Sequence, residues 1–381
     1  MKLLINDHYA NNPGDRVLDS IIGKREIGAP VVGMYCGYAP VELVRAMGAV
    51  PVFLCAFSRK TIPAAEAILP SNLCPLIKSS YGFIVTDTCP FYALSQAIIG
   101  ETTCDGKKKM FELISHIKPT HIMDLPQQPD EKEALANWTI MVHKLRDWLE
   151  KTFGKQITED RIEEEIRETN RKHSLMNHFF SYAAQSPAVI GWNEMYDVIG
   201  LELVSSSDEL ERILDGINLR LDERISNGEF TGTADSPRVL VSGCPVGGDA
   251  AKIFRVIEEA GGVVVAMEAC SGMKGYSIRI DEGTGDPISA LAKAYLQIPC
   301  SCMTPNQHRF DALDEMIDQF RPDSVVDVIL QACHSYNIES HRIGEHVREK
   351  YGLPFLKIET DFTESDRAMI KTRVEALFES I

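Results

Sequence analysis

The sequence contains no apolar run long enough to cross a membrane. A spanning helix needs roughly 18 to 20 consecutive apolar residues, and no stretch approaches that length. The first residues, Met1 to Ile5, run directly into Asn6, Asp7 and His8 without the apolar core of a signal peptide. The sequence therefore predicts a cytoplasmic protein without a membrane partner.

Positive charge is also scarce. Lysine and arginine number 39 against 55 aspartates and glutamates, and the formal net charge is -16. Nucleic acids and anionic lipid surfaces are bound mainly through clustered lysine and arginine, so this balance argues against both classes of partner.

Cysteine is missing from the whole centre of the chain, between Cys104 and Cys244, although the sequence contains ten. The cysteines form two sets of five: Cys36, Cys55, Cys74, Cys89 and Cys104, then Cys244, Cys270, Cys300, Cys302 and Cys333. Most of them stand where an apolar run gives way to glycine, proline, serine or aspartate. In a reducing cytoplasm such thiols are seldom disulfides, which leaves packed free thiols, zinc sites or iron-sulfur sites.

The length of 381 residues exceeds what one hydrophobic core usually holds, and domains of roughly 100 to 200 residues are expected. Residues 1–128 alternate apolar runs with segments of helical spacing. Strands are predicted at 29–35, 48–54, 82–86 and 121–126, and helices at 41–47 and 107–117. This pattern predicts an α/β domain with a parallel sheet.

Residues 129–230 are charged and amphipathic, which predicts a helical bridging segment. Helices are expected at 138–153 and 159–182, with Thr158 as the N-cap of the second. The α/β pattern returns over residues 231–381, after a linker-like stretch at 231–237. Here strands are predicted at 238–243, 261–266 and 324–330, and helices at 250–259 and 309–320.

The second α/β half repeats the first in outline, cysteines included. Cys36 corresponds to Cys244, Cys55 to Cys270, Cys74 to the pair Cys300 and Cys302, and Cys104 to Cys333. We therefore expect two similar doubly wound domains that face each other. Ligands of such folds bind beyond the carboxyl ends of the strands, so both cysteine sets are predicted to converge on one cofactor-binding cleft.

The cysteine spacing does not favour zinc, which prefers closely spaced pairs, because only Cys300 and Cys302 are close in sequence. Iron-sulfur clusters accept thiolates from distant loops and suit the neighbouring glycines. The pattern favours an iron-sulfur site, with another metal or unmetallated thiols as the alternatives.

A phosphate loop is excluded, since five residues separate Gly100 from Gly106 where that motif requires four.

Several charged residues adjoin the cysteines. Lys107, Lys108 and Lys109 begin a predicted helix, where positive charge opposes the macrodipole; at least two should be solvated, and one could offset thiolate charge. His334 directly follows Cys333 and is a candidate proton donor, with a structural role as the alternative. Glu268 should lie near the site if Cys270 does.

Five segments of the sequence resemble a known family. They are YCGYAPVEL at 35–43, LPSNLCPLIKSSYG at 69–82, TTCDGKKK at 102–109, CSC at 300–302 and QACH at 331–334. Through them the chain resembles the 2-hydroxyacyl-CoA dehydratase D-component family, and within it most closely the double-cubane cluster proteins. The resemblance extends over nearly the whole chain.

The resemblance implies an iron-sulfur cofactor and its ligands. Dehydratase subunits hold one 4Fe-4S cluster through three cysteines, and the matching positions here are Cys74, Cys104 and Cys333. Double-cubane relatives use six cysteines for an 8Fe-9S cluster. Cys270 and Cys302 are then the next expected ligands. Cys36 is our choice for the sixth, with Cys244 and Cys300 as open alternatives.

The function implied by this resemblance is that of a homodimeric reductase. A separate ATP-hydrolysing 4Fe-4S activator would supply electrons at low potential, and a small-molecule substrate would accept them near His334. A 2-hydroxyacyl-CoA dehydratase subunit with a single 4Fe-4S cluster is the alternative, and a metal-free binding protein is the third possibility.

Overall fold

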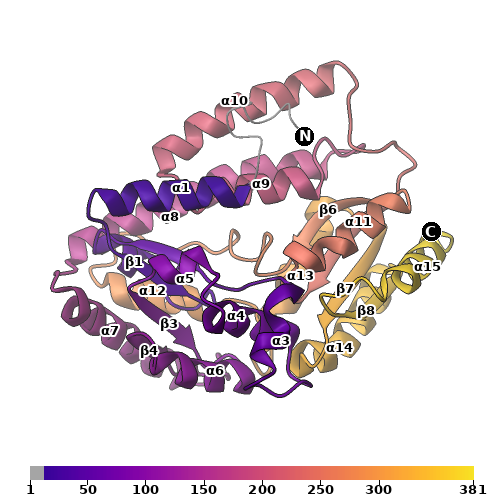
Figure 1. Ribbon diagram of the computed structural model, residues 1–381. Helices are drawn as coiled ribbons and strands as arrows, with labels where there is room; N and C mark the ends of the chain where they lie inside the picture. The colour runs from indigo at the N-terminus through magenta and orange to yellow at the C-terminus, as the bar shows by residue number, and fades with distance from the viewer. Residues whose placement is uncertain (1–12) are drawn as a thin grey trace.

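The computed structural model describes residues 13–381 and contains two four-stranded parallel sheets among helices (Figure 1). The strands and helices make an α/β fold with two similar halves, as the sequence predicts. The amino-terminal segment that lacks a signal-peptide core falls within residues 1–12, outside the described residues. No helix in the described part of the chain is long and apolar enough to cross a membrane.

The amino-terminal sheet has the strand order β2-β1-β3-β4. Its strands are β1 (Val31–Met34), β2 (Val50–Phe53), β3 (Ala97–Glu101) and β4 (Thr120–Met123). Neighbouring residues of β1 enter different cores, Val31 on one face and Val32 on the other, and Ile98 and Ile99 of β3 do the same. Both faces are therefore covered, as a parallel sheet requires.

The helices of this half are mostly short. They are α1 (Pro13–Glu26), α2 (Val41–Ala46), the 3-10 turn η2 (Arg59–Thr61), α3 (Ile62–Ala65), α4 (Pro75–Val85), α5 (Pro90–Leu94) and α6 (Asp105–Ser115). Gly100 allows α6 to pack tightly on β3, because a Cβ atom there would lie 2.6 Å from the Phe111 ring.

One strand prediction is wrong. Residues 82–86, predicted as a strand, form the end of α4, and the strand in this region is β3. Short apolar runs do not distinguish a buried helix from a strand. The decisive signal was Pro75, which occupies the first turn of α4 and is favoured there.

The carboxyl-terminal sheet has the order β6-β5-β7-β8, which is the order of the first sheet with each strand replaced by its counterpart. Its strands are β5 (Arg238–Gly243), β6 (Val263–Glu268), β7 (Ser324–Leu330) and β8 (Phe355–Thr360). Its helical elements are η4 (Gly248–Ala251), α11 (Lys252–Glu259), α12 (Pro287–Leu296), α13 (Gln307–Phe320), α14 (His334–Tyr351) and α15 (Arg367–Phe378). The predicted repeat of the two halves is thus confirmed.

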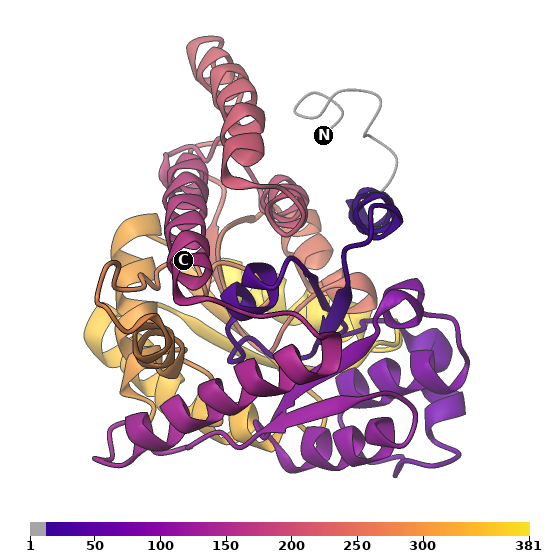
Figure 2. The same ribbon diagram turned by 90° about the vertical axis from the view of Figure 1, so that its left-hand side faces the viewer.

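A helical segment joins the halves. Its later helices lie together at one end of the molecule, whereas its first helix lies beside β4 of the first sheet (Figures 1 and 2). It consists of α7 (Ala134–Phe153), α8 (Glu159–Phe180), η3 (Ser181–Ala184), α9 (Trp192–Glu202) and α10 (Ser207–Ser226). Thr158 caps α8 as predicted, since its side-chain oxygen accepts a hydrogen bond from the Arg161 amide. Helix α8 packs against both α2 and α10.

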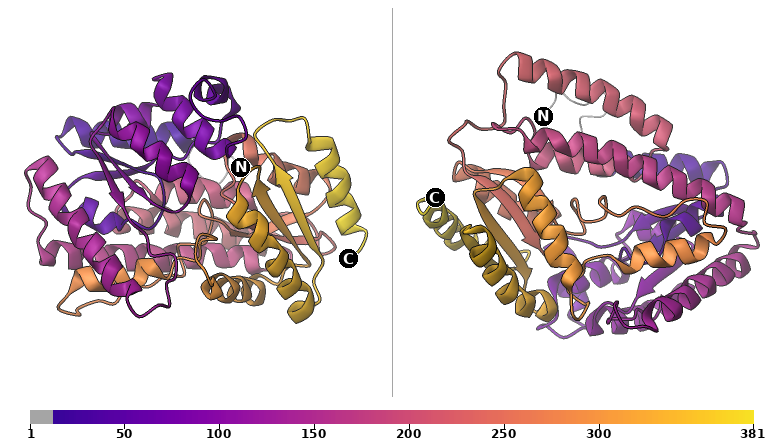
Figure 3. Two further views of the ribbon diagram at one scale, coloured as in Figure 1. Left: turned by 90° about the horizontal axis from the view of Figure 1, so that it is seen from below. Right: turned by 180° about the vertical axis from the view of Figure 1, so that it is seen from behind.

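Helix α12 belongs to the second half in sequence but packs against α7 and α8 (Figure 3). Its buried residues Ile288 and Leu291 share a core with Trp138 of α7 and with Val32 and Ile99 of the first sheet. The chain therefore crosses back to the first half before it completes the second sheet. The boundaries at residues 128 and 230 remain predictions.

Candidate functional site: a gathering of cysteines

Four of the cysteines follow the carboxyl ends of the strands at which the strand order of each sheet reverses. After β1 the chain first continues to β2 on one side and then to β3 on the other, so the loops after β1 and β3 diverge. Cys36 and Cys104 lie in these two loops. Cys244 and Cys333 occupy the equivalent loops after β5 and β7 in the second half. The fold itself thus brings cysteine to both switch points.

Four cysteines also begin helices. Cys74 is the N-cap of α4, Cys104 the N-cap of α6 and Cys333 the N-cap of α14. Cys89 is the N-cap of the short helix α5. The Cys104 sulfur accepts a hydrogen bond from the Lys107 amide at 3.4 Å. A helix N-terminus presents unpaired N–H groups and a partial positive charge, which stabilise a thiolate. The three residues that the family resemblance implies as ligands share this position with Cys89, and burial still raises the pKa of the Cys74 and Cys104 thiols.

Cys74, Cys104, Cys333 and Cys244 form a first group, in which the thiols change one another's pKa. Burial raises the pKa of the Cys74 thiol to about 12, and the charges of Cys333 and Cys104 add to this effect. The Cys244 thiol hydrogen-bonds to Cys333 and lowers the pKa of Cys333, while burial opposes that shift. Sulfur atoms from the two halves therefore lie together here.

The second group consists of Cys36, Cys270, Cys300 and Cys302. A hydrogen bond from Cys302 lowers the pKa of Cys300 to about 5. Burial acts in the opposite direction and raises this pKa, whereas the charges of Lys274 and Lys107 lower it further. Cys36 and Cys302 interact electrostatically across the two halves. Cys104 and Cys300 do the same, and this interaction connects the second group to the first. Cys270 is exposed, so solvent reaches this group from one side.

Lys107 lies between the two groups. Its Nζ atom is 2.9 Å from Cys36 Sγ and 3.8 Å from Cys55 Sγ. Burial would lower the pKa of Lys107, but the charges of Cys36 and Cys55 raise it well above its usual value. The residue is a permanent cation beside the sulfur atoms. Lys108 and Lys109 instead pair with Asp105 and Glu112 at the surface, as the sequence predicts for two of the three lysines.

The other predicted residues are placed differently. His334 begins α14 beside Cys333 and is exposed, and its side chain makes no hydrogen bond or ion pair with residues 13–381. Glu268 ends β6, fully buried, and its carboxylate lies 2.7 Å from Lys274 Nζ. Sequence reasoning missed Lys274. The signal available was its position four residues after Cys270, but a lone lysine in a glycine-containing loop is ordinary.

The gathered sulfurs fit an iron-sulfur centre better than a single metal ion. Within residues 13–381, no three His, Cys, Asp or Glu side chains converge closely enough to hold one ion. Cluster ligands each bind a different iron atom and therefore need not converge on one point. Thiols whose pKa burial raises, such as Cys74, become thiolates when iron binds them. The donor set and the adjacent cation both suit such a group.

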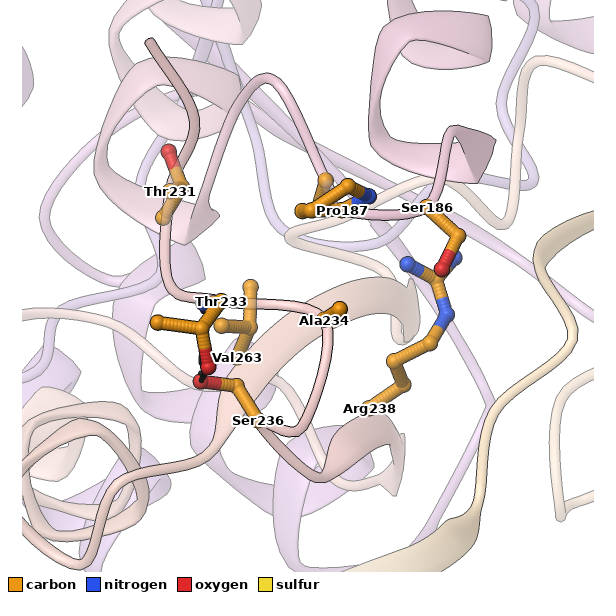
Figure 4. Close-up of a pocket in the computed structure, with 9 residues that line it drawn as sticks. Ser186, Pro187, Thr231, Thr233, Ala234, Ser236, Arg238 and Val263 are labelled. Carbon is orange, nitrogen blue, oxygen red and sulfur yellow. Dashed lines mark hydrogen bonds between the residues drawn. The ribbon is translucent and has the colours of Figure 1, made fainter. Parts of the chain in front are cut away.

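A small pocket elsewhere does not compete with this site. It lies at the amino ends of β5 and β6, between residues 186–188 and 231–236 (Figure 4). Its volume is about 10 Å³, at the lower limit for one water molecule. The Arg238 guanidinium beside it donates hydrogen bonds to four backbone carbonyls, of residues 183, 185, 320 and 321. Arg238 therefore ties loops together.

Comparison with known proteins identifies dehydratase subunits. Residues 36–381 match the family described as 2-hydroxyglutaryl-CoA dehydratase, D-component. The chain is 41% identical to the Escherichia coli (strain K12) protein named "Putative dehydratase subunit YjiM", over 95% of this chain and 94% of that protein. It is 24% identical to lactoyl-CoA dehydratase subunit beta of Anaerotignum propionicum, over 94% and 93% of the two chains. With (R)-2-hydroxyglutaryl-CoA dehydratase, subunit beta, of Acidaminococcus fermentans, the identity is 20% over 93% of each chain.

Proposed function

Because the chain belongs to the family of the 2-hydroxyglutaryl-CoA dehydratase D-component, we propose that it is an iron-sulfur reductase. Its cofactor is a double-cubane 8Fe-9S cluster, and it transfers low-potential electrons to a small molecule. The observation that carries this proposal is the gathering of eight cysteines from both halves into two connected groups. A single 4Fe-4S cluster with three protein ligands would leave most of these thiols without a role.

The ligands divide between the two groups. Cys74, Cys104 and Cys333 of the first group hold one subcluster, and their helix N-termini favour the thiolate form. Cys270 and Cys302 of the second group hold the other, together with Cys36 or Cys300. The lowered pKa of Cys300 supports Cys300. Cys36 is supported by the hydrogen bond from Lys107, which opposes the burial that raises the pKa of Cys36.

The surrounding residues control charge and access at this centre. The cluster, when bound, supplies the electrons. Lys107 places a positive charge beside the sulfurs, and the amide of residue 107 donates to Cys104. His334 is exposed next to Cys333 and can bring a proton from solvent to a substrate at the open side, where Cys270 is also accessible.

The proposal includes two partners. A separate ATP-hydrolysing 4Fe-4S activator reduces the centre, which agrees with the absence of a phosphate loop from the sequence. A second copy of the chain completes a homodimer. The net charge of -16 favours an activator with a basic docking face.

A dehydratase subunit with one 4Fe-4S cluster is the second candidate function, and the names of the relatives favour it. Three of them are named as beta subunits of dehydratases that act on lactoyl-CoA, phenyllactyl-CoA and 2-hydroxyglutaryl-CoA. In this case Cys74, Cys104 and Cys333 would be the complete ligand set, and the remaining cysteines would be packed thiols.

Anaerobic purification with iron and sulfide quantitation separates these functions. The reductase predicts about eight irons per chain and self-association on size-exclusion chromatography. About four irons per chain, together with dehydration of a 2-hydroxyacyl-CoA in the presence of a partner subunit, would support the dehydratase instead. A colourless, iron-free protein after anaerobic reconstitution would contradict both.

A further inference from the structure

A segment of the first half is hydrogen-bonded to the second half between two of the cysteine loops. The segment, residues 55–61, follows β2 and begins at Cys55. The Arg59 amide donates a hydrogen bond to the Asp249 carboxylate at 2.8 Å, and the Asp249 amide donates one to the Phe57 carbonyl at 2.8 Å. These two bonds join the halves in both directions. We call them, together with the Phe57 side chain, the 57–249 contact.

The Phe57 side chain packs closely on the second half. A Cβ atom added at Gly247 would lie 3.1 Å from the Phe57 ring, and one added at Gly248 would lie 2.5 Å from the Phe57 carbonyl oxygen. The ring centroid is 6.2 Å from that of buried Phe362, which follows β8. Gly248 also has a φ of 47°, which favours glycine. The two glycines therefore allow the loops to approach this closely.

On the side of the first half, the same segment is fixed to α4. The amide of residue 56 donates a hydrogen bond to the Ser80 hydroxyl at 3.1 Å, and the Ser58 amide donates one to the Ser79 hydroxyl at 3.0 Å. Cys74 is the N-cap of α4. The 57–249 contact is thus linked to one cysteine of the first group through a single helix.

On the side of the second half, Asp249 lies in the loop that begins with Cys244 after β5. The Cys244 amide donates a hydrogen bond to the Val328 carbonyl at 2.8 Å, and the Cys244 sulfur accepts one from the Leu330 amide at 3.3 Å. Both partners belong to β7, which Cys333 follows. The 57–249 contact therefore lies between the cysteines that the two halves bring to the first group.

The first cysteine group is enclosed by both halves. Cys74 of the first half is 8% exposed, and Cys244 of the second half is 1% exposed. Exchange of material at an enclosed site requires a local opening, and the contacts that close the site set the free energy of that opening. Iron bound by these thiols can therefore leave faster when a contact that holds the halves together is removed.

We infer that Asp249 and Phe57 hold the two halves closed over the first cysteine group and thereby set how fast a bound iron-sulfur centre loses its iron. This inference rests on the proposed function, since it requires a centre bound by cysteines of both halves. Asp249 is a positioning residue, because it acts through the loop that carries Cys244. Removal of its carboxylate leaves the bond from its amide to Phe57 in place, so the variant should fold.

The test is the rate at which the anaerobically purified protein loses iron to a chelator. Asp249→Ala removes the carboxylate, and Gly248→Ala forces the Phe57 carbonyl away. Asp323→Ala is the matched control. The Asp323 carboxylate accepts a hydrogen bond from the Arg238 amide at 2.8 Å, and the Asp323 amide donates one to the Arg238 carbonyl at 2.7 Å. This pair has the same form but lies within the second half, at the amino end of β5.

Two measurements on the metal-free proteins accompany the chelation assay. Urea unfolding reports global stability, which Asp249→Ala and Asp323→Ala should lower by similar amounts. Hydrogen exchange at the amide of residue 249 reports opening between the halves, because that amide keeps its own bond to Phe57 in Asp249→Ala. It should exchange faster in Asp249→Ala than in the wild type or in Asp323→Ala.

We expect Asp249→Ala and Gly248→Ala to lose iron about fivefold faster than the wild type, the effect of one hydrogen bond. Asp323→Ala should lose iron at the wild-type rate. Equal rates in Asp249→Ala and Asp323→Ala, or unchanged exchange at residue 249, would overturn the inference and leave the proposed function standing. Asp249→Ala decides alone if Gly248→Ala fails to fold. An iron-free wild type would overturn the proposed function together with this inference.

Discussion

Replacing Arg309 with methionine should destabilise the protein in a pH-dependent way. Arg309 is fully buried, and its guanidinium contacts Glu268, Asp327 and Glu339 as well as the Ser242 hydroxyl at 3.0 Å. Removing one member of a buried ion pair leaves an uncompensated charge and costs about 3 to 5 kcal/mol. A typical domain has a total stability of about 5 to 15 kcal/mol, so the loss should be easily measured.

The pH dependence follows from Glu268. Burial raises its pKa, but Arg309 and Lys274 outweigh burial, and the pKa of Glu268 in the folded protein is below its usual value. Glu268 therefore contributes its full stabilisation to the wild-type protein above the unfolded pKa of about 4.3. This contribution is lost as the pH falls through the lower pKa of Glu268 in the folded protein. Without Arg309, burial is less opposed and the folded pKa should exceed about 4.3. The variant then loses stability as the pH rises, and its deficit should be greater at about pH 7.5 than at about pH 5.

The assay is urea unfolding of the metal-free protein, followed by circular dichroism at both pH values. Arg279→Met serves as the control, because Arg279 is 77% exposed and its nearest carboxylate, Glu282, is 3.8 Å away. A deficit below about 1 kcal/mol, or one that does not change with pH, would refute the role of Arg309 as the counter-charge of the carboxylates around it.

Substitutions at three further positions test the fold. Trp138→Ala should cost about 3 to 5 kcal/mol in thermal or urea unfolding, and Trp138→Phe much less, since the buried indole N–H has no hydrogen-bond partner within residues 13–381. Equal losses would contradict a packing role for the ring. Gly82→Ala should cost about 1 to 3 kcal/mol, because the new Cβ would lie 2.2 Å from the Thr61 carbonyl oxygen, and an unchanged midpoint would show that α4 can shift. Thr158→Ala should lower stability by about 1 kcal/mol through loss of the α8 cap, whereas Thr158→Ser should retain it.

The sequence predicted the parts of the fold that depend on local patterns. Strands β5 and β7 match their predicted ranges of 238–243 and 324–330, because each is a mainly apolar run bounded by turn residues. The repeat of the two halves was visible for the same reason, as equivalent cysteines follow equivalent strands. The strand predicted at 82–86 was wrong because an apolar run of that length also suits a buried helix, here α4.

The remaining features depend on contacts between distant segments. The packing of α12 against α7 has no signature in either segment, since any apolar helix face could pair with another. Lys274 carries no motif, and its ion pair with buried Glu268 and its hydrogen bond to Tyr336 appear only in the folded structure. The sequence did indicate that the two cysteine sets would meet, because the carboxyl ends of both sheets were predicted to face each other.

The account depends most directly on whether cysteines of both groups bind iron. The measurement is the iron and sulfide content of anaerobically purified Cys74→Ser, Cys270→Ser and Cys89→Ser proteins beside the wild type. Cys89 is the control, because it caps α5 through the Tyr92 amide and interacts with Lys118 rather than with the gathered cysteines. We predict that Cys74→Ser and Cys270→Ser each lose a substantial part of the iron and that Cys89→Ser retains all of it. Full iron content in Cys270→Ser would contradict the second group as a ligand site, and iron loss in Cys89→Ser alone would contradict the whole assignment.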